Sequence, residues 1–237
     1  MKRFWDDVTI RRDETGHAIL LDGKPMHLPG GGILWVGPVP LAEAIAAEWR
    51  QAGGVKGGEM SFADTPLTRL AGTAVGRIAP DPDQTIDVIA RYGESDLLCY
   101  RAEHPVELIE RQAREWQPWL DWVAQAHDAP LRVTAGIGHV KQHRDSIAAL
   151  RRAVAGLDAY ALAALGVAVP SMGSLVLGLA LAAGRLDGAT AHAIGMLDEL
   201  FQQEQWGEDH EALKRRQSVA DDLALAERLL ILSRETG

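Results

Sequence analysis

The sequence predicts an α+β fold, with a small N-terminal domain of strands and helices over residues 1–80 and a larger, mainly α-helical domain over residues 81–237. Short apolar and β-branched runs, separated by turn residues, fill the first forty positions. Apolar residues spaced four apart begin at Leu41 and recur through most of the remaining chain. Two prolines among acids at 79–83 separate the two patterns, because proline prevents a helix from continuing.

Strands are expected first. The four short runs that predict them are Val8–Ile10, Ala18–Leu21, Lys24–Leu28 and Ile33–Val36. Asp13–Gly16 supplies turn residues between the first two runs, and Asp22-Gly23 supplies the positive φ of a two-residue hairpin turn. Pro29-Gly30-Gly31-Gly32 makes a turn before the fourth run, and Gly30–Gly32 is the part that could suggest a phosphate-binding loop. It lacks the Lys-Ser/Thr end and the following helix of a phosphate-binding loop.

Helices complete the N-terminal domain. Leu41, Ile45 and Trp49 form the apolar stripe of an amphipathic helix that Gly53-Gly54 ends. A second helix is expected after Thr65-Pro66, because proline suits the first helical position.

Helical spacing predominates in the C-terminal domain. The expected helices cover 86–92, 105–127, 145–155, 158–165, 171–183, 188–203 and 209–232. Trp116, Trp119 and Trp122 recur at every third position of the long second helix, and we expect them to fill the core. Residues 131–138 are expected to be extended.

The stretch from Ala159 to Gly184 carries no charge and is long enough to cross a bilayer. Pro170 and Ser171 are expected to break it and to start a fresh helix. The long apolar half would then measure about 16 Å, against a hydrocarbon core of about 30 Å. Small residues that permit close helix packing recur every fourth position at Ser174, Gly178 and Ala182. We therefore expect buried core helices and no stable membrane insertion.

Bulk properties exclude several classes of function. A formal net charge of -9 argues against general binding to nucleic acid, which requires clustered Lys and Arg. The single cysteine, Cys99, excludes an intramolecular disulfide and a multi-cysteine zinc site. Because the N-terminal residues show no apolar signal core, we expect a cytoplasmic protein. We also expect it to be soluble and monomeric.

Two histidines are the candidates for metal binding. His139 and His143 have the spacing of ligands on a helix, but Gly136 and Gly138 disfavour a helix there. A third ligand is lacking in the sequence around them. We expect no metal.

Candidate nucleophiles also have simpler interpretations. Ser171 and Ser174 lack a G-x-S-x-G context and are interpreted as helix caps. Cys99 lies in an apolar run, where burial would raise the pKa of its thiol and make it inert. We therefore expect no catalytic residue and no cofactor.

Acidic residues between positions 198 and 211 are the strongest local feature, because the interval contains no Lys or Arg. The acids are Asp198, Glu199, Glu204, Glu208, Asp209 and Glu211, with Trp206-Gly207 in their midst. They allow three interpretations. They are a solvated face with helix-start acids, paired carboxylates for acid/base hydrolysis, or an acidic patch with an aromatic anchor that docks a partner.

This acidic segment resembles the signature of the ATP synthase F1-sector assembly chaperones that attend the alpha subunit. The strings concerned are Leu197-Asp198-Glu199 and Glu204-Gln205-Trp206-Gly207-Glu208-Asp209. Further strings agree with that family in order and spacing: Arg3-Phe4-Trp5 with Val8-Thr9, Leu20-Leu21-Asp22-Gly23-Lys24-Pro25, Ala46-Ala47-Glu48-Trp49, Pro66-Leu67-Thr68-Arg69-Leu70, Asp96-Leu97-Leu98-Cys99-Tyr100-Arg101 and Ser174-Leu175-Val176-Leu177.

The resemblance implies a two-domain chaperone that binds the free alpha subunit of the F1 sector and prevents its aggregation until beta arrives. It implies a required acid at Asp198 or Glu199, without choosing between them. The partner-binding residues it implies are Asp198, Glu199, Glu204, Trp206, Gly207, Glu208 and Asp209. The alternatives are a hydrolase that uses paired C-terminal carboxylates and an adaptor for another protein client.

Overall fold

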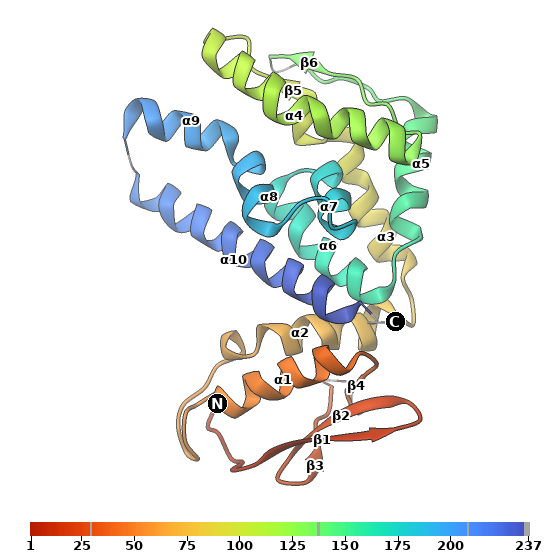
Figure 1. The fold of residues 1–237 in the computed structure, drawn as a ribbon, viewed down its shortest axis with the longest axis vertical. Coiled ribbons are helices and arrows are strands. Elements are labelled where there is room, and N and C mark those ends of the chain that lie inside the picture. The colour runs from red at the N-terminus through yellow and green to blue at the C-terminus, as the bar shows by residue number, and fades with distance from the viewer. Residues whose placement is uncertain (29, 137, 208, 235–237) are drawn as a thin grey trace. The chain divides into compact units, whose positions relative to one another are not determined.

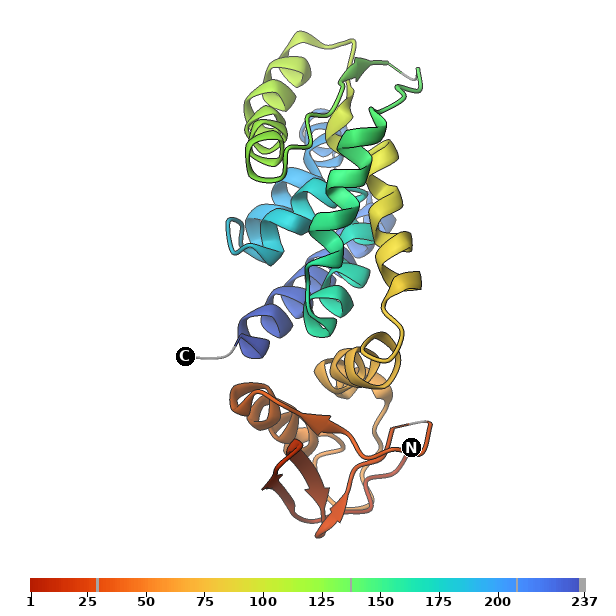
Figure 2. The ribbon, with the colours of Figure 1, turned by 90° about the vertical axis from the view of Figure 1, so that its right-hand side faces the viewer.

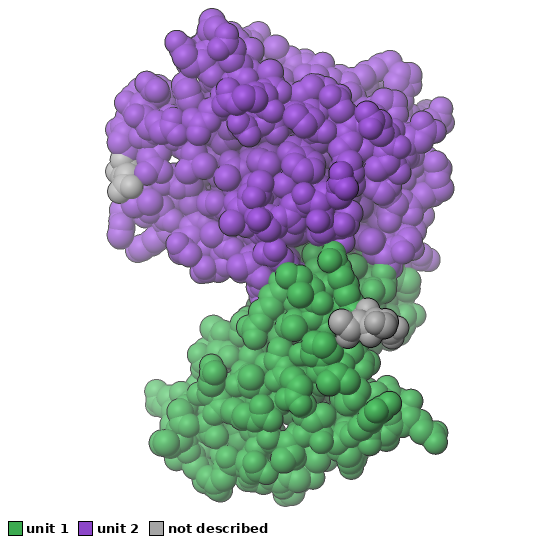
Figure 3. All heavy atoms as spheres, in the orientation of Figure 1, with its two compact units in different colours: residues 1–82, 158–164, 228–237 green, residues 83–157, 165–227 purple. Residues whose placement is uncertain are grey.

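Contacts among the described residues group the chain into two compact units (Figure 3). Unit 1 comprises Met1–Pro82, Asp158–Ala164 and Arg228–Gly237, and unit 2 comprises Asp83–Leu157 and Leu165–Glu227. The computed structural model describes every residue except 29, 137, 208 and 235–237. Two later segments group with the N-terminal residues, so the units are not continuous in sequence. The sequence-based division at residue 80 stays a prediction.

A small antiparallel sheet begins unit 1 (Figure 1). β1 (Val8–Asp13) pairs with β2 (Gly16–Leu21), in a register that runs from Val8 opposite Leu21 to Asp13 opposite Gly16. β3 (Lys24–Pro25) and β4 (Trp35–Val36) also pair with β2. Both are shorter than the sequence predicts. The amide of Leu34 donates to the carbonyl of Met26 and that of Leu28 to Gly32, so this segment largely bonds to itself.

Helices α1 (Val39–Gln51) and α2 (Pro66–Thr73) follow in unit 1, as the sequence predicts. The predicted stripe Leu41, Ile45 and Trp49 is buried. Gly53 and Gly54 come just after α1 with φ of 71° and 64°, a conformation that glycine adopts without strain. A π-helical turn, Ala74–Ile78, extends α2.

A buried carboxylate on α1 contributes to the contact between α1 and α2. Glu48 on α1 is buried, and its two carboxylate oxygens accept hydrogen bonds from the amides of Leu67 (2.7 Å) and Thr68 (2.9 Å). These amides belong to the first turn of α2, where intrahelical acceptors are lacking. The Glu48 side chain therefore caps α2 and fixes its start against α1.

Unit 2 is mainly helical. Its elements are α3 (Asp83–Ala90), α4 (Val106–His127), α5 (Arg144–Ala155), most of α6 (Ala159–Met172), α7 (Leu175–Ala182), α8 (Gly188–Gly195), α9 (Leu197–Trp206) and most of α10 (His210–Ser233). The short strands β5 (Tyr100–Arg101) and β6 (Thr134–Ala135) pair in parallel. The predicted helix 188–203 is wrong in one respect, because Met196 interrupts it with φ -102° and ψ 17°.

The break in the uncharged stretch lies three residues later than the sequence predicts. Pro170 lies inside α6, and its ring removes the hydrogen bond that would reach the carbonyl of Gly166, a residue exposed to solvent. The chain turns instead at Gly173, with φ 68°, and Ser174 caps α7 by accepting from the amide of Leu177. Ser171 is not a cap, because its hydroxyl donates to Asp222 on α10.

The uncharged helices are core helices. α7 is buried from Leu175 to Leu181. A Cβ at Gly178 would collide with Val169 on α6, so the predicted small-residue position does allow close helix approach. Among the described residues, no helix combines the length and apolar character needed to cross a membrane.

A buried carboxylate organises the start of α7. Asp96 is fully buried, and its oxygens accept from the Ser174 hydroxyl (2.9 Å) and from the amides of Leu98 (3.1 Å) and Val176 (2.9 Å). Burial raises the pKa of Asp96 to about 6, because the charged form is poorly solvated there, and these hydrogen bonds oppose the shift. Asp96 thus links the turn after α3 to α7.

The tryptophans of α4 differ from the prediction. Trp116 is fully buried and its indole donates to the carbonyl of Ile194 (2.9 Å). Trp119 and Trp122 are only partly buried and contact each other edge to face. A spacing of three residues is shorter than one helical turn, so each successive side chain points farther from the face of the first. Only Trp116 therefore reaches the core.

Candidate functional site

The acidic residues that the sequence singles out lie on α9 and at the start of α10 (Figure 1). Leu197 and Phe201 are the buried residues of α9, four positions apart on one face. This narrow apolar contact leaves most of the helix polar. The orientation of α9 is therefore also set by its polar contacts with α4 and α10.

Asp198 turns toward α4. Its carboxylate accepts a hydrogen bond of 2.7 Å from the side-chain amide of Gln112, a buried residue of α4. Burial raises the pKa of Asp198 and the nearby Glu199 charge adds to the shift, while the Gln112 bond and the Arg101 charge oppose it. Asp198 is thus a half-buried tether between α9 and α4.

Gln112 and Arg101 extend this contact into the core. The Gln112 side chain accepts from the amide of Ala102 (2.8 Å), and Arg101 donates to the Gln112 carbonyl (2.7 Å). The guanidinium of Arg101 also lies over the ring of Trp116, 5.3 Å from its centroid. Partial burial lowers the pKa of Arg101. Asp198 is therefore connected to the centre of unit 2 through fixed groups.

Glu199 turns the other way, toward α10. Its Oε1 pairs with the guanidinium of Arg215, while its Oε2 is buried and has no hydrogen-bond partner among the described residues. Nearby, Arg216 donates to the side chain of Gln203. These contacts join α9 to α10. One acceptor of Glu199 stays unused, which is costly for a carboxylate oxygen away from water.

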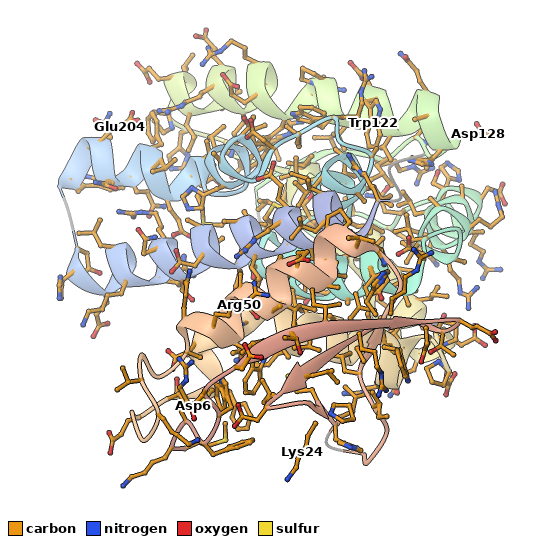
Figure 4. All side chains as sticks on the ribbon, turned by 60° about the horizontal axis from the view of Figure 1, so that its bottom comes forward. Asp6, Lys24, Arg50, Trp122, Asp128 and Glu204 are labelled. Carbon is orange, nitrogen blue, oxygen red and sulfur yellow. The ribbon has the colours of Figure 1, made fainter. Side chains whose placement is uncertain are left out.

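Glu204 lies toward the outer end of α9 (Figure 4). It accepts two hydrogen bonds from Arg111 on α4, at 2.9 Å and 2.7 Å. The pair raises the pKa of Arg111, and about half of the Glu204 side chain is exposed. The pair is therefore accessible to competing ions.

Trp206 ends α9 and is the most exposed large apolar side chain of the described residues, at 79%. Gly207 follows with φ 90° and ends the helix, three residues beyond the predicted end at 203. Asp209 then accepts from the amide of Glu211 at the start of α10. Glu208, also predicted to bind the partner, lies outside the described residues.

The acids of α9 do not converge on one point. Asp198 contacts α4 near the core, Glu199 contacts α10, and Glu204 contacts α4 farther out. The sequence predicts these acids but misses their partners. The missed residues are Arg101, Gln112, Arg111 and Arg215. Only Arg101 carried a signal, as the last residue of a string that resembles the chaperone family.

The remaining chemical candidates have structural contacts. Cys99 is buried, and burial raises the pKa of its thiol to about 12, so the predicted inertness follows. His139 bonds to the Tyr100 hydroxyl and His143 to Arg132. Within the described part of the chain, His, Cys, Asp and Glu side chains do not gather in a group of three that could hold a metal ion.

Comparison with known proteins identifies the class. The family model described as ATP12 chaperone protein matches residues 2–124. This match and the fold define the chain as an assembly chaperone. The chain belongs to the ATP12 chaperone family, whose members assist assembly of ATP synthase and act on F1 subunits.

Solved structures agree over nearly the whole chain. Atp12 from Paracoccus denitrificans is 41% identical, with a TM-score of 0.91 over 98% of both chains. The same values apply to a mutant of that protein in which lysine replaces an aspartate. Atu1473 protein from Agrobacterium tumefaciens is 37% identical, with a TM-score of 0.90 over 98% of this chain and 86% of that one.

A eukaryotic relative is more distant. The mitochondrial protein atp12 of Schizosaccharomyces pombe is 24% identical over 233 residues, which cover 91% of this chain and 79% of that protein.

The α+β fold with a larger helical part, predicted from the sequence, is confirmed.

Proposed function

We propose that this chain binds the free alpha subunit of the F1 sector and keeps it from aggregating until that subunit pairs with beta. Membership of a family that acts on F1 subunits supports a client from that sector. The observation that carries the proposed binding site is Trp206, 79% exposed at the end of a helix that bears Asp198, Glu199 and Glu204.

The proposed mechanism begins with the client. A subunit without its neighbour exposes apolar surface where the neighbour will pack, and such surfaces aggregate. An exposed tryptophan among carboxylates can cover apolar area while the acids pair with cations at its rim. A modest interface of this kind would be displaced by the larger interface with beta. This action requires no cofactor and no turnover.

The acids of α9 would take part through exchange of ion pairs. Glu204 is bonded to Arg111, and Glu199 to Arg215, in exposed or half-exposed pairs. A client Arg or Lys could replace either partner at little cost, because exposed pairs contribute little stability. The Oε2 of Glu199 is buried, so only its Oε1 would exchange partners. The mutant of the Paracoccus protein, with an aspartate changed to lysine, shows that charge reversal leaves that fold intact.

The residues proposed to contact the client are Asp198, Glu199, Glu204, Trp206, Gly207, Glu208 and Asp209. Asp198 and Glu199 remain the two candidates for the required acid. Their contacts suggest different defects. Asp198→Asn would disturb the tether to Gln112, whereas Glu199→Gln would alter only the pair with Arg215 and the unused acceptor.

Co-expression with the alpha subunit, followed by size-exclusion chromatography, tests the proposal. Trp206→Ala is expected to reduce the complex at least about tenfold, as an interface tryptophan does, with the thermal unfolding curve unchanged. Val88→Ala provides a control, because Val88 is 49% exposed on α3. Failure of the unmodified chain to comigrate with alpha would reject the proposal.

The alternatives have less support. A hydrolase would need two carboxylates that face one substrate, whereas Asp198, Glu199 and Glu204 each turn to a different partner. An adaptor for an unrelated client would bind through the same helix. It would be distinguished in the co-expression experiment by the absence of a complex with alpha.

A further inference from the structure

A second charged surface lies in unit 2, in a part of the chain that the proposed function does not use. Residues 129–157 contain five Lys and Arg residues and a single acid, Asp145, although the whole chain has a net charge of -9. All five cations are exposed. The excess of positive charge is therefore local, and its sign is opposite to that of the net charge of the whole chain.

Helix α5 presents part of this charge on one side. Its exposed positions include Arg144, Ala148, Arg151 and Arg152, which helical spacing places on one face. Ala148 is small, so it leaves the flanking guanidinium groups unobstructed. α5 and the segment with β6 face the viewer in Figure 2.

The β6 segment adds two more cations. Arg132 and Lys141 are both exposed, and the guanidinium of Arg132 contacts the ring of His143 and the carbonyl of Lys141. The contact with His143 holds Arg132 beside the first turn of α5. We define the basic face as Arg132, Lys141, Arg144 and Arg152.

None of these four side chains has a carboxylate partner among the described residues. Arg151, by contrast, is neutralised by Asp87 on α3 at 2.8 Å. The acids nearest in sequence are Asp145, in the first turn of α5, Asp128, after α4, and Asp158, after α5. Glu103 lies close to Gly136. These acids reduce the local charge without pairing with the basic face.

The basic face and α9 lie on opposite sides of unit 2. In Figure 1 α9 is at the left of this unit and α5 at the right, and Figure 2 shows α5 in front after the quarter turn. The two charged surfaces are separate candidates for binding.

We propose that the basic face is a docking surface for a protein partner that presents clustered carboxylates. Charge complementarity is the argument for this occupant. Unpaired guanidinium groups form paired hydrogen bonds with carboxylates and act within a Debye length of about 8 Å. Nucleic acid and anionic membranes carry a denser and more extended negative charge than a folded partner with a local carboxylate cluster, so the net charge of -9 repels them more strongly.

The test uses the full chain and a fluorescein-labelled oligoglutamate peptide as the probe, measured by fluorescence anisotropy at low salt. The triple variant Arg132→Glu, Arg144→Glu and Arg152→Glu is expected to weaken binding about tenfold or more. The matched control reverses Arg12, Lys24 and Arg185, which are exposed cations outside this face. It has the same net charge and is expected to change binding less than about threefold.

Each other outcome overturns the proposal. An equal loss of peptide binding in both triple variants would show that net charge alone governs the binding. If neither variant lost binding, the basic face would not be the docking surface. A DNA duplex or phosphatidylserine vesicles that bind more tightly than the peptide, through the same residues, would point to a different class of partner. A concentration-dependent dimer that the first triple variant abolishes would make a second copy the occupant.

Folding is checked separately. The variant positions are exposed, and circular dichroism melts should match those of the unmodified chain. If the triple variant unfolds, the neutral double variant Arg144→Gln and Arg152→Gln replaces it, with an expected loss of at least about threefold. Unchanged peptide binding by that folded variant would equally reject the proposal. The result is independent of whether the alpha subunit binds.

Discussion

Carboxylates have different partners in the interior of this molecule and on α9. Glu48 in unit 1 and Asp96 in unit 2 are buried and accept hydrogen bonds from backbone amides at helix starts. Glu199 and Glu204 on α9 pair with Arg side chains of neighbouring helices. Asp198 is intermediate, because it is half-buried and bonded to a side-chain amide.

The partners explain why one set is structural and the other is available for binding. A backbone amide at the first turn of a helix cannot move away, and it has no substitute acceptor if the carboxylate is removed. An Arg side chain can leave its carboxylate for water or for a client at little cost. Removing an interior carboxylate should therefore reduce stability, whereas removing one from α9 should mainly alter binding.

The largest expected effect is at Asp96. Asp96→Ala would leave the Leu98 and Val176 amides and the Ser174 hydroxyl without their acceptor, inside the core. We expect the free energy of unfolding to fall by about 4 kcal/mol in urea denaturation. Asp87→Ala is the control on α3, because Asp87 forms an exposed pair with Arg151, and it should cost less than about 1 kcal/mol. Similar costs for the two variants would contradict the comparison.

The second effect is a pH dependence at the same residue. The pKa of Asp96 is raised to about 6 in the folded state, from about 4 when unfolded. The folded protein therefore binds this proton more tightly, and the stability that the group contributes is lost as the pH rises from about 4 through 6. The cost of Asp96→Asn should thus shrink by about 2 to 3 kcal/mol between about pH 4 and pH 7. A cost that stays constant over this range would mean that Asp96 titrates normally.

Glu48 should give the third effect. Glu48→Ala removes the acceptor of the Leu67 and Thr68 amides, and we expect a loss of about 2 to 3 kcal/mol in the free energy of unfolding. Glu43 lies on the same helix and is exposed, 3.9 Å from Arg50. Its change to alanine should cost about 0.5 kcal/mol or less in the same urea titration. A smaller loss for Glu48 than for Glu43 would rule out the capping role.

The smallest effect is expected on α9. A double-mutant cycle with Glu204→Gln and Arg111→Gln should give a coupling of about 0.5 to 1 kcal/mol, because the pair is partly exposed. Added salt should reduce it. A coupling above about 3 kcal/mol would place this pair with the interior carboxylates and would argue against its exchange with a client.

Much of the fold could be predicted from local pattern. The period of four that places Leu41, Ile45 and Trp49 on one side of α1 is a property of neighbouring residues, and so is the hairpin at Asp22-Gly23. The predicted helix break at Pro170 is wrong. A proline is tolerated inside a helix when the carbonyl that loses its hydrogen bond, here that of Gly166, can reach solvent. β3 and β4 are short because Leu34 bonds to Met26 and Leu28 to Gly32, across the predicted turn, instead of to β2.

The candidate site could be predicted only in part. The sequence located the acids, the exposed Trp206 and the helix end at Gly207, since these are consecutive features of one segment. It could not assign their partners. Gln112 lies 86 residues from Asp198 and Arg111 lies 93 residues from Glu204, and only the packing of α9 on α4 brings these pairs together.

The sequence by itself determined the class of fold, the family and the segment that carries the acids, because helical period, turn residues and short motifs are local. Tertiary structure alone decided which carboxylate is a cap, which is a tether and which is an exchangeable ion pair. The physical reason is that a carboxylate is defined by its burial and by its donors. Both are set by residues distant in the chain that folding places around it.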